Sequence, residues 1–349
     1  MKKPKVLVVA TSRKTRGGIT AVVKAHQAGP QWREFHCRWI ETSRDGAAWR
    51  KLLYLAAALA QYVVLLPFYD IVHLHLTGGT SVRRKAVFFR LARLMGKRTI
   101  VHFHPSGPEV LDDPASARHL RRLFTGADRV VVLSGQWRTW LSERLGVTER
   151  VTVLYNPCPA VPPPTARRQP VVLFAGSVIA RKGYDTLIRA FALVAKRHEE
   201  WCLVVAGNGE VDRARALAAQ LGIKERAKFP GWVSGETKER LFNEASIFCL
   251  ASMGEGFPMA VLDAWAHGVP CVVTPVGGLP DVVREGENAL TFPVGDARAL
   301  AAQLARLMAA PALRERLSQA SLRLARTTFD AANIRRQLVG IYTEVWNEK

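Results

Sequence analysis

The sequence predicts an α/β protein made of two Rossmann-like domains, each built on a parallel sheet and facing the other across a cleft. Strand-like and helical segments alternate along nearly the whole chain, which is typical of a parallel sheet with helical crossovers. A proline-rich stretch divides this alternation in two, and 349 residues exceed what one hydrophobic core usually organises. Open parallel sheets bind ligands beyond the carboxyl ends of their strands, so we expect the substrates in the cleft.

The first half of the chain, residues 1–158, is expected to form one domain. Its helical segments begin at Ile19, Ser81, near Ala115 and at Gln136. Its predicted strands are apolar runs at 5–11, 70–76, 98–104, 128–134 and 150–155. Residues 156–170, "NPCPAVPPPTARRQP", contain six prolines, and we place an interdomain linker at 159–170.

The second domain is expected over residues 171–330. Helical segments run from Tyr184, through Arg215, from Glu236 and from Met259, and residues 296–347 are helical almost throughout, with apolar residues at a period of 3.6. The predicted strands between them lie at 170–176, 201–207, 227–231, 246–252, 270–274 and 289–292.

The positive charge of the chain is concentrated in its first half. Residues 1–150 hold 26 lysines and arginines against 10 acids, whereas the remainder holds 24 against 19. A basic amphipathic helix is expected from Ser81. Because it lacks balancing acids, attraction to an anionic membrane surface or a phosphorylated acceptor explains it at least as well as the alternative, a merely solvated face. No zinc finger, basic zipper or RNA-binding signature is present, so we expect no specific nucleic acid partner.

The stretch "LLYLAAALAQYVVLLPF", residues 52–68, is apolar apart from Gln61 and Pro67 and falls just short of a membrane span. We expect a helix packed into the domain, with contact at a membrane interface as the alternative. The five cysteines are widely spaced, which favours neither a disulfide framework nor a zinc site. The opening "MKKPKVLVVATS" is typical of a first strand rather than a signal peptide, so we expect a cytoplasmic protein, peripheral on the inner face of the membrane.

The stretch "GEGFPMAVLDAWAHGVP", residues 254–270, places Glu255 before a predicted helix and Asp263 inside it. Pro258 stands near the first turn, where a missing N–H costs little, and a helix amino terminus is a ready anion site. Carboxylates accept hydrogen bonds from hydroxyls, so the pair can bracket a ligand with phosphates between a sugar and a ribose. The alternative is that both acids only favour the helix start electrostatically.

The stretch "GSVIARKGYD", residues 176–185, supplies the opposite charge after a strand. Arg181 and Lys182 can neutralise a diphosphate, and Gly183 permits close backbone approach. An exposed cation pair is the alternative, stronger for Arg181 than for Lys182. Gly17 and Gly18 similarly open a helix, with a simple tight turn as an equal explanation.

Histidines alternate along two strands, His73 with His75 and His102 with His104, so each pair shares a strand face. A metal site of four imidazoles is conceivable, but we expect none because no acid accompanies them. His104, followed by "PSG", is the best candidate for substrate contact.

Five stretches resemble, in register, the retaining GT-B glycosyltransferases of family 4. They are "VLSGQW", "FAGSVIARKGYDTLIRAF", "LVVAGNGE", "FPGWV" and "GEGFPMAVLDAWAHGVPCVVTPVGGLPDVV", the last being similar to the E-x7-E segment. The resemblance covers nearly the whole chain. It implies a C-terminal domain that holds a nucleoside diphosphate sugar and an N-terminal domain that holds the acceptor, with a final helix at 331–349 returning to the first domain.

Site residues carry over from the resemblance by position. Lys182 is implied to contact the donor diphosphate, Glu255 the transferred sugar and Asp263 the ribose hydroxyls. The region of the base is implied at Trp232 and Val233, the phosphate-binding amides at Phe257, Met259 and Ala260, and the cleft histidine that approaches the sugar at His104. Gly17, Gly18, Ser177 and Arg181 complete the expected donor-binding set.

The sequence departs from the family pattern at three positions. Ser177 stands where the family usually has arginine, so the second cation for the diphosphate is expected to be Arg181. Asp263 replaces the second glutamate and is one methylene shorter. Pro258 replaces a glycine and removes one amide donor.

The reaction implied is transfer of a hexosyl group to an acceptor hydroxyl with retention at the anomeric carbon, in polysaccharide or glycolipid assembly. No Asp-x-Asp motif appears, so we expect no metal or other cofactor in the transfer. The alternatives are another GT-B enzyme, such as a nucleotide-sugar 2-epimerase or an inverting transferase, and a non-catalytic relative that binds lipid or nucleic acid. The sugar, the base, the acceptor and the oligomeric state stay open.

Overall fold

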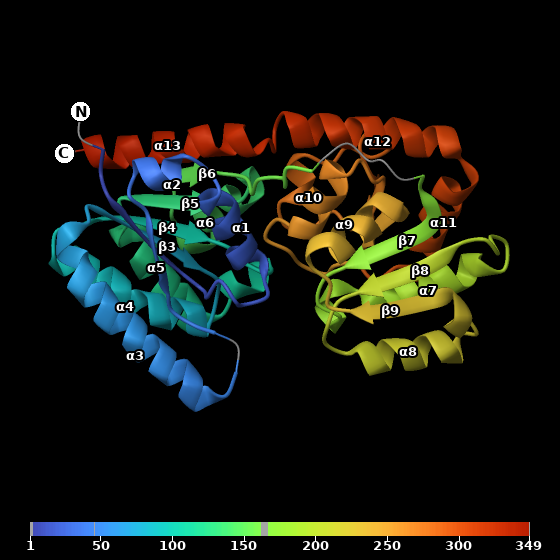
Figure 1. The fold of residues 1–349 in the computed structure, drawn as a ribbon, viewed down its shortest axis with the longest axis horizontal. Coiled ribbons are helices and arrows are strands. Elements are labelled where there is room, and N and C mark those ends of the chain that lie inside the picture. The colour runs from blue at the N-terminus through green and yellow to red at the C-terminus, as the bar shows by residue number, and fades with distance from the viewer. Residues whose placement is uncertain (1–2, 45, 162–166, 349) are drawn as a thin grey trace. The chain divides into compact units, whose positions relative to one another are not determined.

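The computed structural model describes residues 3–44, 46–161 and 167–348, so part of the expected linker lies outside the described residues. The chain forms two compact units, one of residues 1–157 with 331–349 and one of residues 158–330. Each unit contains a six-stranded parallel sheet with helices on both faces (Figure 1). The predicted fold class is therefore confirmed.

The sheet of the N-terminal unit has the strand order β2-β1-β3-β4-β5-β6, and every neighbouring pair is parallel. Its strands are β1 (Val6–Ala10), β2 (Arg38–Glu41), β3 (Ile71–Leu76), β4 (Arg98–Phe103), β5 (Arg129–Val132) and β6 (Val151–Val153). The sequence analysis missed the edge strand β2, because four residues with one apolar pair give no clear alternation. The order reverses between β1 and β3, which is where open sheets of this kind bind ligands.

Alternate residues of β1 face two different cores. Leu7 and Val9 join the core under α3 (Ala48–Leu65), α4 (Thr80–Leu94), α5 (Pro114–Gly126) and α6 (Gly135–Leu145). Val6 and Val8 join the core under α1 (Gly18–Gln27) and α13 (Ala331–Asn347). Because a central parallel strand is covered on both faces, its run of apolar residues is continuous rather than alternating. A short helix α2 (Gln31–Glu34) precedes β2, and the 3-10 helices η1 (Leu66–Phe68) and η2 (Pro108–Leu111) follow α3 and β4.

The sheet of the C-terminal unit has the order β12-β11-β10-β7-β8-β9. Its strands are β7 (Gln169–Ala175), β8 (Cys202–Ala206), β9 (Ala227–Gly231), β10 (Ala245–Leu250), β11 (Cys271–Val273) and β12 (Leu290–Thr291). The order reverses between β7 and β10, so the loops after these two strands must lie beside each other. Those loops carry "GSVIARKG" and "ASMGEGFP".

The helices of the C-terminal unit alternate with its strands. They are α7 (Tyr184–Ala195), α8 (Val211–Gln220), α9 (Gly235–Glu244), α10 (Met259–Ala266), α11 (Ala297–Ala309) and α12 (Pro311–Arg326), with 3-10 helices η3 (Ala180–Lys182), η4 (Lys224–Arg226) and η5 (Leu279–Asp281). The helices expected from Tyr184, Glu236 and Met259 are therefore confirmed, with starts within one residue.

The apolar stretch 52–68 forms most of α3 and all of η1. One side of α3 packs into the N-terminal unit through Ala58 and Tyr62, whose Oη donates to the backbone oxygen of Phe88 at 2.8 Å. The other side is exposed, because only 17% of its most apolar 18-residue window is buried. The expectation of a helix packed into the domain is therefore wrong for the exposed side of α3, and it holds for the side that carries Ala58 and Tyr62. By length and composition, Ala48–Phe68 is the one helix of the described residues that could cross a membrane.

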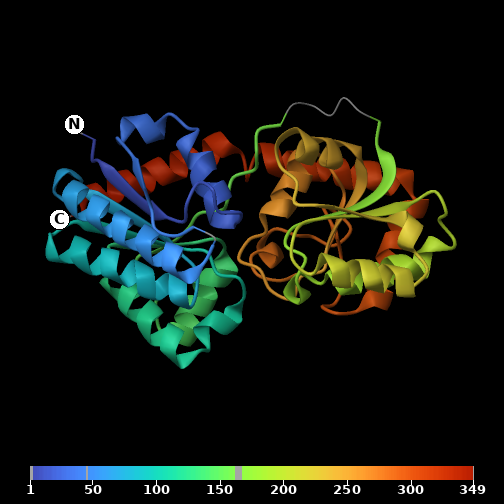
Figure 2. The ribbon, with the colours of Figure 1, turned by 60° about the horizontal axis from the view of Figure 1, so that its bottom comes forward.

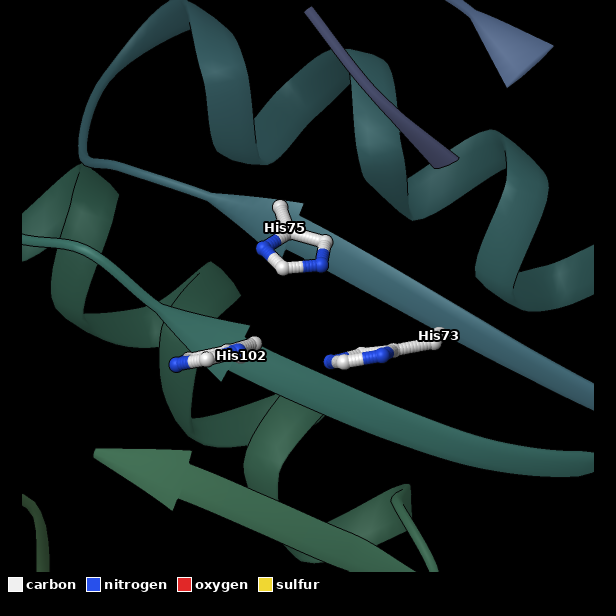
Figure 3. A group of neighbouring side chains, drawn as sticks. All are labelled: His73, His75 and His102. Atoms are coloured by element: carbon white, nitrogen blue, oxygen red, sulfur yellow. The ribbon is translucent and has the colours of Figure 1, made fainter. Parts of the chain in front are cut away.

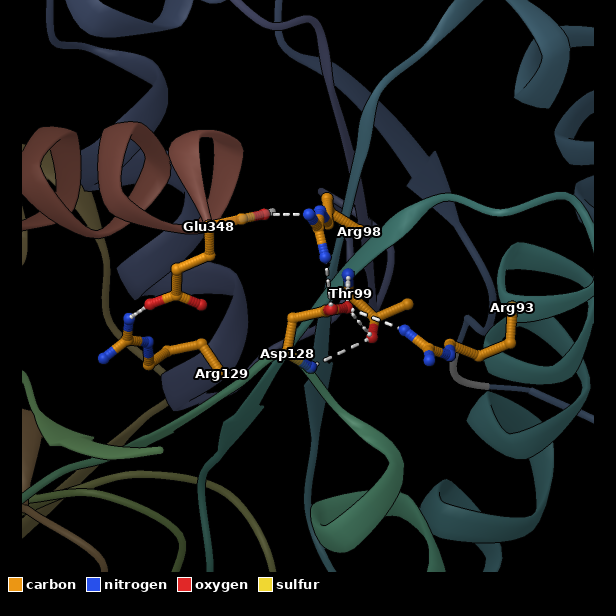
Figure 4. A network of polar contacts seen from close by, with 6 residues as sticks. All are labelled: Arg93, Arg98, Thr99, Asp128, Arg129 and Glu348. Carbon is orange, nitrogen blue, oxygen red and sulfur yellow. Dashed lines mark hydrogen bonds and ion pairs between the residues drawn. The ribbon is translucent and has the colours of Figure 1, made fainter. Parts of the chain in front are cut away.

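Asp128, just before β5, joins β4 to α4 in the N-terminal unit (Figure 4). Its buried carboxylate accepts hydrogen bonds from the Thr99 backbone N–H at 2.8 Å and the Thr99 hydroxyl at 2.9 Å. Arg93 and Arg98 pair with it at 3.0 and 3.1 Å. Burial pushes the pKa of Asp128 upward, but the hydrogen bonds from Thr99 and the two arginines outweigh burial and lower it below its ordinary value.

We predict that Asp128→Asn destabilises the N-terminal unit at neutral pH by about 1–3 kcal/mol, the usual range for losing hydrogen bonds to a buried charged group. Because the pKa of Asp128 is lower in the folded state, its contribution is present above the unfolded pKa and is lost as the pH falls through the folded pKa. Denaturant unfolding should therefore show a difference in unfolding free energy between the wild type and Asp128→Asn that is smaller at acidic pH than at neutral pH. Asp112→Asn, at a carboxylate that is 61% exposed, is the control, and an equal effect in both variants would contradict the prediction.

Candidate active site

The loops after β7 and β10 meet at the point where the strand order of the C-terminal unit reverses. The Met253 N–H donates to the Arg181 backbone oxygen at 2.8 Å, which fixes one loop against the other. Gly183 has a positive φ of 66°, and a Cβ there would lie 1.9 Å from the Ala251 oxygen. Only glycine fits this close approach, as the sequence analysis expected.

Glu255 is buried at the centre of this junction with 5% of its surface exposed. Its carboxylate accepts a hydrogen bond from the Ser252 hydroxyl at 2.6 Å and forms an ion pair with the Lys182 ammonium. A Cβ at Gly277, which also has positive φ, would lie 2.1 Å from the Glu255 backbone oxygen, so a third loop closes over the same residue. The structure thus brings the two principal predicted residues, Lys182 and Glu255, into direct contact.

Arg181 points toward the same loop as Lys182. Its guanidinium donates to the backbone oxygen of Gly254, next to Glu255. Both cations therefore lie where the loop after β7 meets the loop before α10. An ammonium has three donors, so Lys182 can keep Glu255 and still donate to an anion.

The helix α10 begins at Met259, directly after Pro258. Its first amides, at Met259 and Ala260, have no acceptor inside the helix, and the aligned peptide dipoles give this end a partial positive charge. Both residues are partly exposed, whereas Phe257 is buried with 4% exposure. The amino terminus of α10 can therefore receive a phosphate, as expected, with Met259 and Ala260 presenting their amides more openly than Phe257.

Asp263 lies one turn into α10 and is 9% exposed. Its partner is Lys238 of α9, whose ammonium contacts the carboxylate at 2.6 Å. Burial raises the pKa of Asp263 above its ordinary value even though Lys238 acts in the opposite direction. The sequence analysis missed Lys238, because nothing in "GETKERLF" indicates which residue faces α10.

The remaining predicted residues of this unit follow its other strands at the same edge of the sheet. Ser177 lies in the loop after β7, and Val178, its neighbour, bridges to Gly209 in the loop after β8. Trp232 and Val233 follow β9, and the Trp232 side chain is 39% exposed. Since β7, β8 and β9 are consecutive neighbours, these loops form one continuous rim.

The other three predicted residues belong to the N-terminal unit. Gly17 precedes α1 and Gly18 begins it, and a Cβ at Gly17 would meet nothing within 4 Å, so neither strain nor crowding requires glycine at 17. His104 follows β4, is buried, and its Nε2 lies 2.9 Å from Nδ1 of His75. Burial, together with the nearby His26, lowers the pKa of His104 to about 3, so its imidazole is neutral at physiological pH.

A carboxylate that the sequence analysis did not single out lies at the carboxyl end of β2. Glu41 accepts hydrogen bonds from the Ser12 hydroxyl at 2.6 Å and the Tyr54 hydroxyl at 3.0 Å, and it pairs with Arg13. Burial pushes the pKa of Glu41 upward, but these bonds outweigh it and lower the pKa. Glu41, Arg13 and Tyr54 line a pocket of about 650 Å³ that also contains Trp32. The sequence analysis missed Glu41 because its position at the end of a strand is the only signal that could have pointed to it, and β2 was not predicted as a strand.

Comparison with known proteins defines the class first. A solved HepE structure from Anabaena, with UDP and glucose bound, superposes with a TM-score of 0.78 over 97% of this chain and 99% of that one at 17% identity. At this identity the likeness shows the fold, which is the GT-B arrangement of two Rossmann-like domains.

The family follows from the sequence. Residues 6–160 match the family described as "Glycosyltransferase Family 4", and residues 162–323 match "Glycosyl transferases group 1". The chain therefore belongs to the family 4 glycosyltransferases, as the motifs indicated.

Two relatives show how far the likeness reaches. An uncharacterized glycosyltransferase of Methanocaldococcus jannaschii is 36% identical over 121 residues, which span 34% of this chain and only 31% of that protein. The phosphatidyl-myo-inositol mannosyltransferase of Mycobacterium leprae is 27% identical over 79% of this chain and 74% of that protein.

We predict that Asp263→Asn changes how the stability of the C-terminal unit depends on pH. Relative to the wild type, the variant should be more stable at neutral pH than it is in acid. Because burial raises the folded pKa of Asp263, wild-type stability falls as the pH rises from the unfolded value of 3.8 through the folded value, and asparagine does not titrate. Unfolding free energies measured at several pH values should therefore diverge in favour of the variant as the pH rises. Asp212→Asn, at a side chain that is 99% exposed, should show no such divergence. Parallel curves for wild type and Asp263→Asn would refute this account.

Proposed function

We propose that the chain transfers a hexosyl group from a nucleoside diphosphate sugar to an acceptor hydroxyl, with retention at the anomeric carbon, in polysaccharide or glycolipid assembly. The observation that carries this proposal is the buried Lys182–Glu255 pair beside the amino terminus of α10, at the reversal point of a parallel sheet. A cation, a hydroxyl-accepting carboxylate and free amides are the groups that a sugar diphosphate requires. The solved relative with UDP and glucose has the same fold.

The diphosphate is the part of the donor that gains charge as the sugar leaves. We assign its binding to Lys182, Arg181 and the first amides of α10, which are preorganised by the loop contacts and need no rearrangement during the reaction. These groups supply positive charge without a metal ion, and we propose that transfer needs none.

The donor's other parts fall to residues along the same rim. Glu255 accepts hydrogen bonds from hydroxyls of the transferred sugar, and Asp263 accepts those of the ribose while Lys238 keeps it ionised. Trp232 and Val233 face the base, with Ser177 beside the diphosphate. We assign the neutral imidazole of His104, together with the open turn at Gly17 and Gly18, to the sugar and acceptor side, as the resemblance implies.

Donor binding provides the first test. We expect calorimetry to detect a UDP, GDP or ADP sugar, and Lys182→Ala to reduce kcat/KM by about 10²-fold or more, the usual loss when a preorganised charge-stabilising donor is removed. Lys196→Ala, an exposed lysine that follows α7, is the matched control. Circular dichroism should show that both variants are folded, because Lys182→Ala leaves Glu255 buried without its cation. Undiminished turnover in Lys182→Ala would refute the proposed function, and the anomeric configuration of the product, read by NMR, tests retention.

We further propose that the N-terminal unit lies on the inner face of the membrane through α3 and the end of α4, which run side by side (Figure 2). Leu52, Leu53, Val63 and Val64 of α3 are 52–67% exposed, and their spacing of 11 residues, about three turns, places them on one helix face. Phe68 and Leu94 extend this apolar ridge and are 68% and 82% exposed.

Basic residues flank the apolar ridge. Arg50 and Lys51 begin α3, and Arg83 and Arg90 are exposed on α4. The opposite side of α3 packs on the unit through Ala58 and Tyr62, so the helix is held at the protein surface and lies along an interface rather than crossing it. An apolar face with a cationic border fits an anionic bilayer, and the mannosyltransferase relative is named for a phosphatidylinositol acceptor.

Vesicle sedimentation tests this surface. We expect the chain to bind vesicles that contain phosphatidylglycerol, and Leu52→Ser with Leu53→Ser to weaken binding by about tenfold per leucine, since each buried leucine contributes roughly 1.5 kcal/mol. Leu193→Ser, at a leucine of α7 that is 59% exposed, is the control. Equal binding by the wild type, the Leu52→Ser, Leu53→Ser double variant and Leu193→Ser would contradict the proposed membrane surface. It would not affect the proposal for the transfer reaction.

A further inference from the structure

Four buried histidines form a cluster inside the N-terminal unit, and three of them, His73, His75 and His102, have no role in the transfer site proposed above. His73 and His75 of β3, His102 of β4 and His104, which directly follows β4, lie on one face of the sheet, with His75 directly opposite His102. His73, His75 and His102 are each only 1% exposed. Figure 3 shows the rings of these three residues gathered beside the two strands.

The surroundings of these rings favour the neutral imidazole over the charged form. Burial, together with the neighbouring histidines, lowers the pKa of His73, His75 and His102 well below the ordinary value. Among the described residues, none of the hydrogen bonds or ion pairs of these rings involves a carboxylate. Neutral imidazole is the form of histidine that ligates metals.

Two of the rings are held in a fixed orientation by hydrogen bonds at Nδ1. His73 Nδ1 lies 2.9 Å from the hydroxyl of Tyr342, and His75 Nδ1 lies 2.9 Å from Nε2 of His104. Both bonds leave Nε2 for another partner. Metal-ligating histidines are almost always oriented in this way, by a hydrogen bond from the nitrogen that does not bind the metal.

The nitrogens that remain are buried and unsatisfied. His73 Nε2 and both ring nitrogens of His102 have no hydrogen-bond partner in the described part of the chain. Burying such atoms without a partner costs free energy, so a ligand that satisfies several of them together stabilises the unit. One ligand nitrogen from each of His73, His75 and His102 lies within 4.8 Å of the others.

We propose that His73, His75 and His102 bind one divalent transition-metal ion of the zinc class. With metal–nitrogen bonds of about 2.0–2.1 Å, tetrahedral ligands stand roughly 3.3 Å apart. The three ligand nitrogens now lie within 4.8 Å of one another, so the rings move toward one another when the ion binds. Imidazole suits zinc, cobalt, nickel and copper, and three histidines leave the fourth position for water. The ion joins β3 to β4 and, through Tyr342, both strands to α13. It has a structural role. The sequence analysis considered a metal at these histidines and expected none because no acid accompanies them, and the proposal reverses that expectation because Tyr342 and His104 orient two of the rings.

Metal content of the full chain tests the proposal. The untagged protein is treated with chelator, refolded with one equivalent of Zn²⁺ or Co²⁺, and passed through a desalting column. We expect about one ion per chain by mass spectrometry, the visible absorption of tetrahedral Co²⁺, and a rise in the thermal midpoint of unfolding. His102→Ala should lose the ion, whereas His119→Ala, at a partly exposed histidine of α5 outside the cluster, should retain it.

A second variant keeps the test decisive if His102→Ala does not fold. Tyr342→Phe retains the aromatic packing but removes the hydrogen bond to His73, and we expect metal affinity to fall about 10–100-fold, as for other groups that orient a ligand. Wild type that holds no ion after refolding with metal would show that water or nothing fills the cluster and would overturn the proposal. Equal metal content in wild type and His102→Ala would overturn it as well. Donor binding and transfer do not depend on either result.

Discussion

The candidate active site depends on the cost of burying the charge of Glu255. A carboxylate that is 5% exposed is tolerated only when it is paired and hydrogen-bonded, and here Lys182 and Ser252 meet that requirement. The pairing holds the loops after β7 and β10 together. The backbone approaches so closely at Gly183, and at Gly277 in the loop after β11, that a side chain has no room there. The same pair places a cation and acceptor oxygens together, which are the groups that the proposed donor requires.

Much of the fold follows from the sequence because parallel strands covered on both faces are continuous apolar runs. β1 is such a run and β7 is apolar from Pro170 onward, and the loops at their carboxyl ends carry motifs that locate the site. The sequence fails where burial is partial or contacts are distant. β2 is an edge strand with only two buried residues, and α3 is apolar on its exposed side as well as its packed side, so neither shows the expected pattern.

Some contacts of the site residues could be predicted from the sequence, whereas others could not. Gly183 and the contact of Lys182 with the E-x7-E segment could be inferred, because strand order and loop position determine them. Lys238, which pairs with Asp263, could not, since α9 carries several charged residues and only the packing of α9 against the unit selects one. Glu41 was missed for a similar reason: Ser12 and Tyr54, which give it its environment, are 29 and 13 residues away in the chain.

The N-terminal unit is built from two segments that lie far apart in the chain, residues 1–157 and 331–349. Its structure depends on contacts between them. Tyr342 of α13 reaches His73 across 269 positions, and Ile334, Leu338 and Val345 of α13 complete the core formed by alternate residues of β1. Residues 1–157 alone would leave that apolar face, and the Nδ1 of His73, exposed to water. Contacts between such distant residues form late, because closing the long loop between them costs conformational entropy before the contacts can stabilise the fold. The hydrogen bond of Tyr342 to His73 and the contacts of α13 with the second core can therefore form only after the C-terminal unit, which lies between the two segments in the chain, has been synthesised.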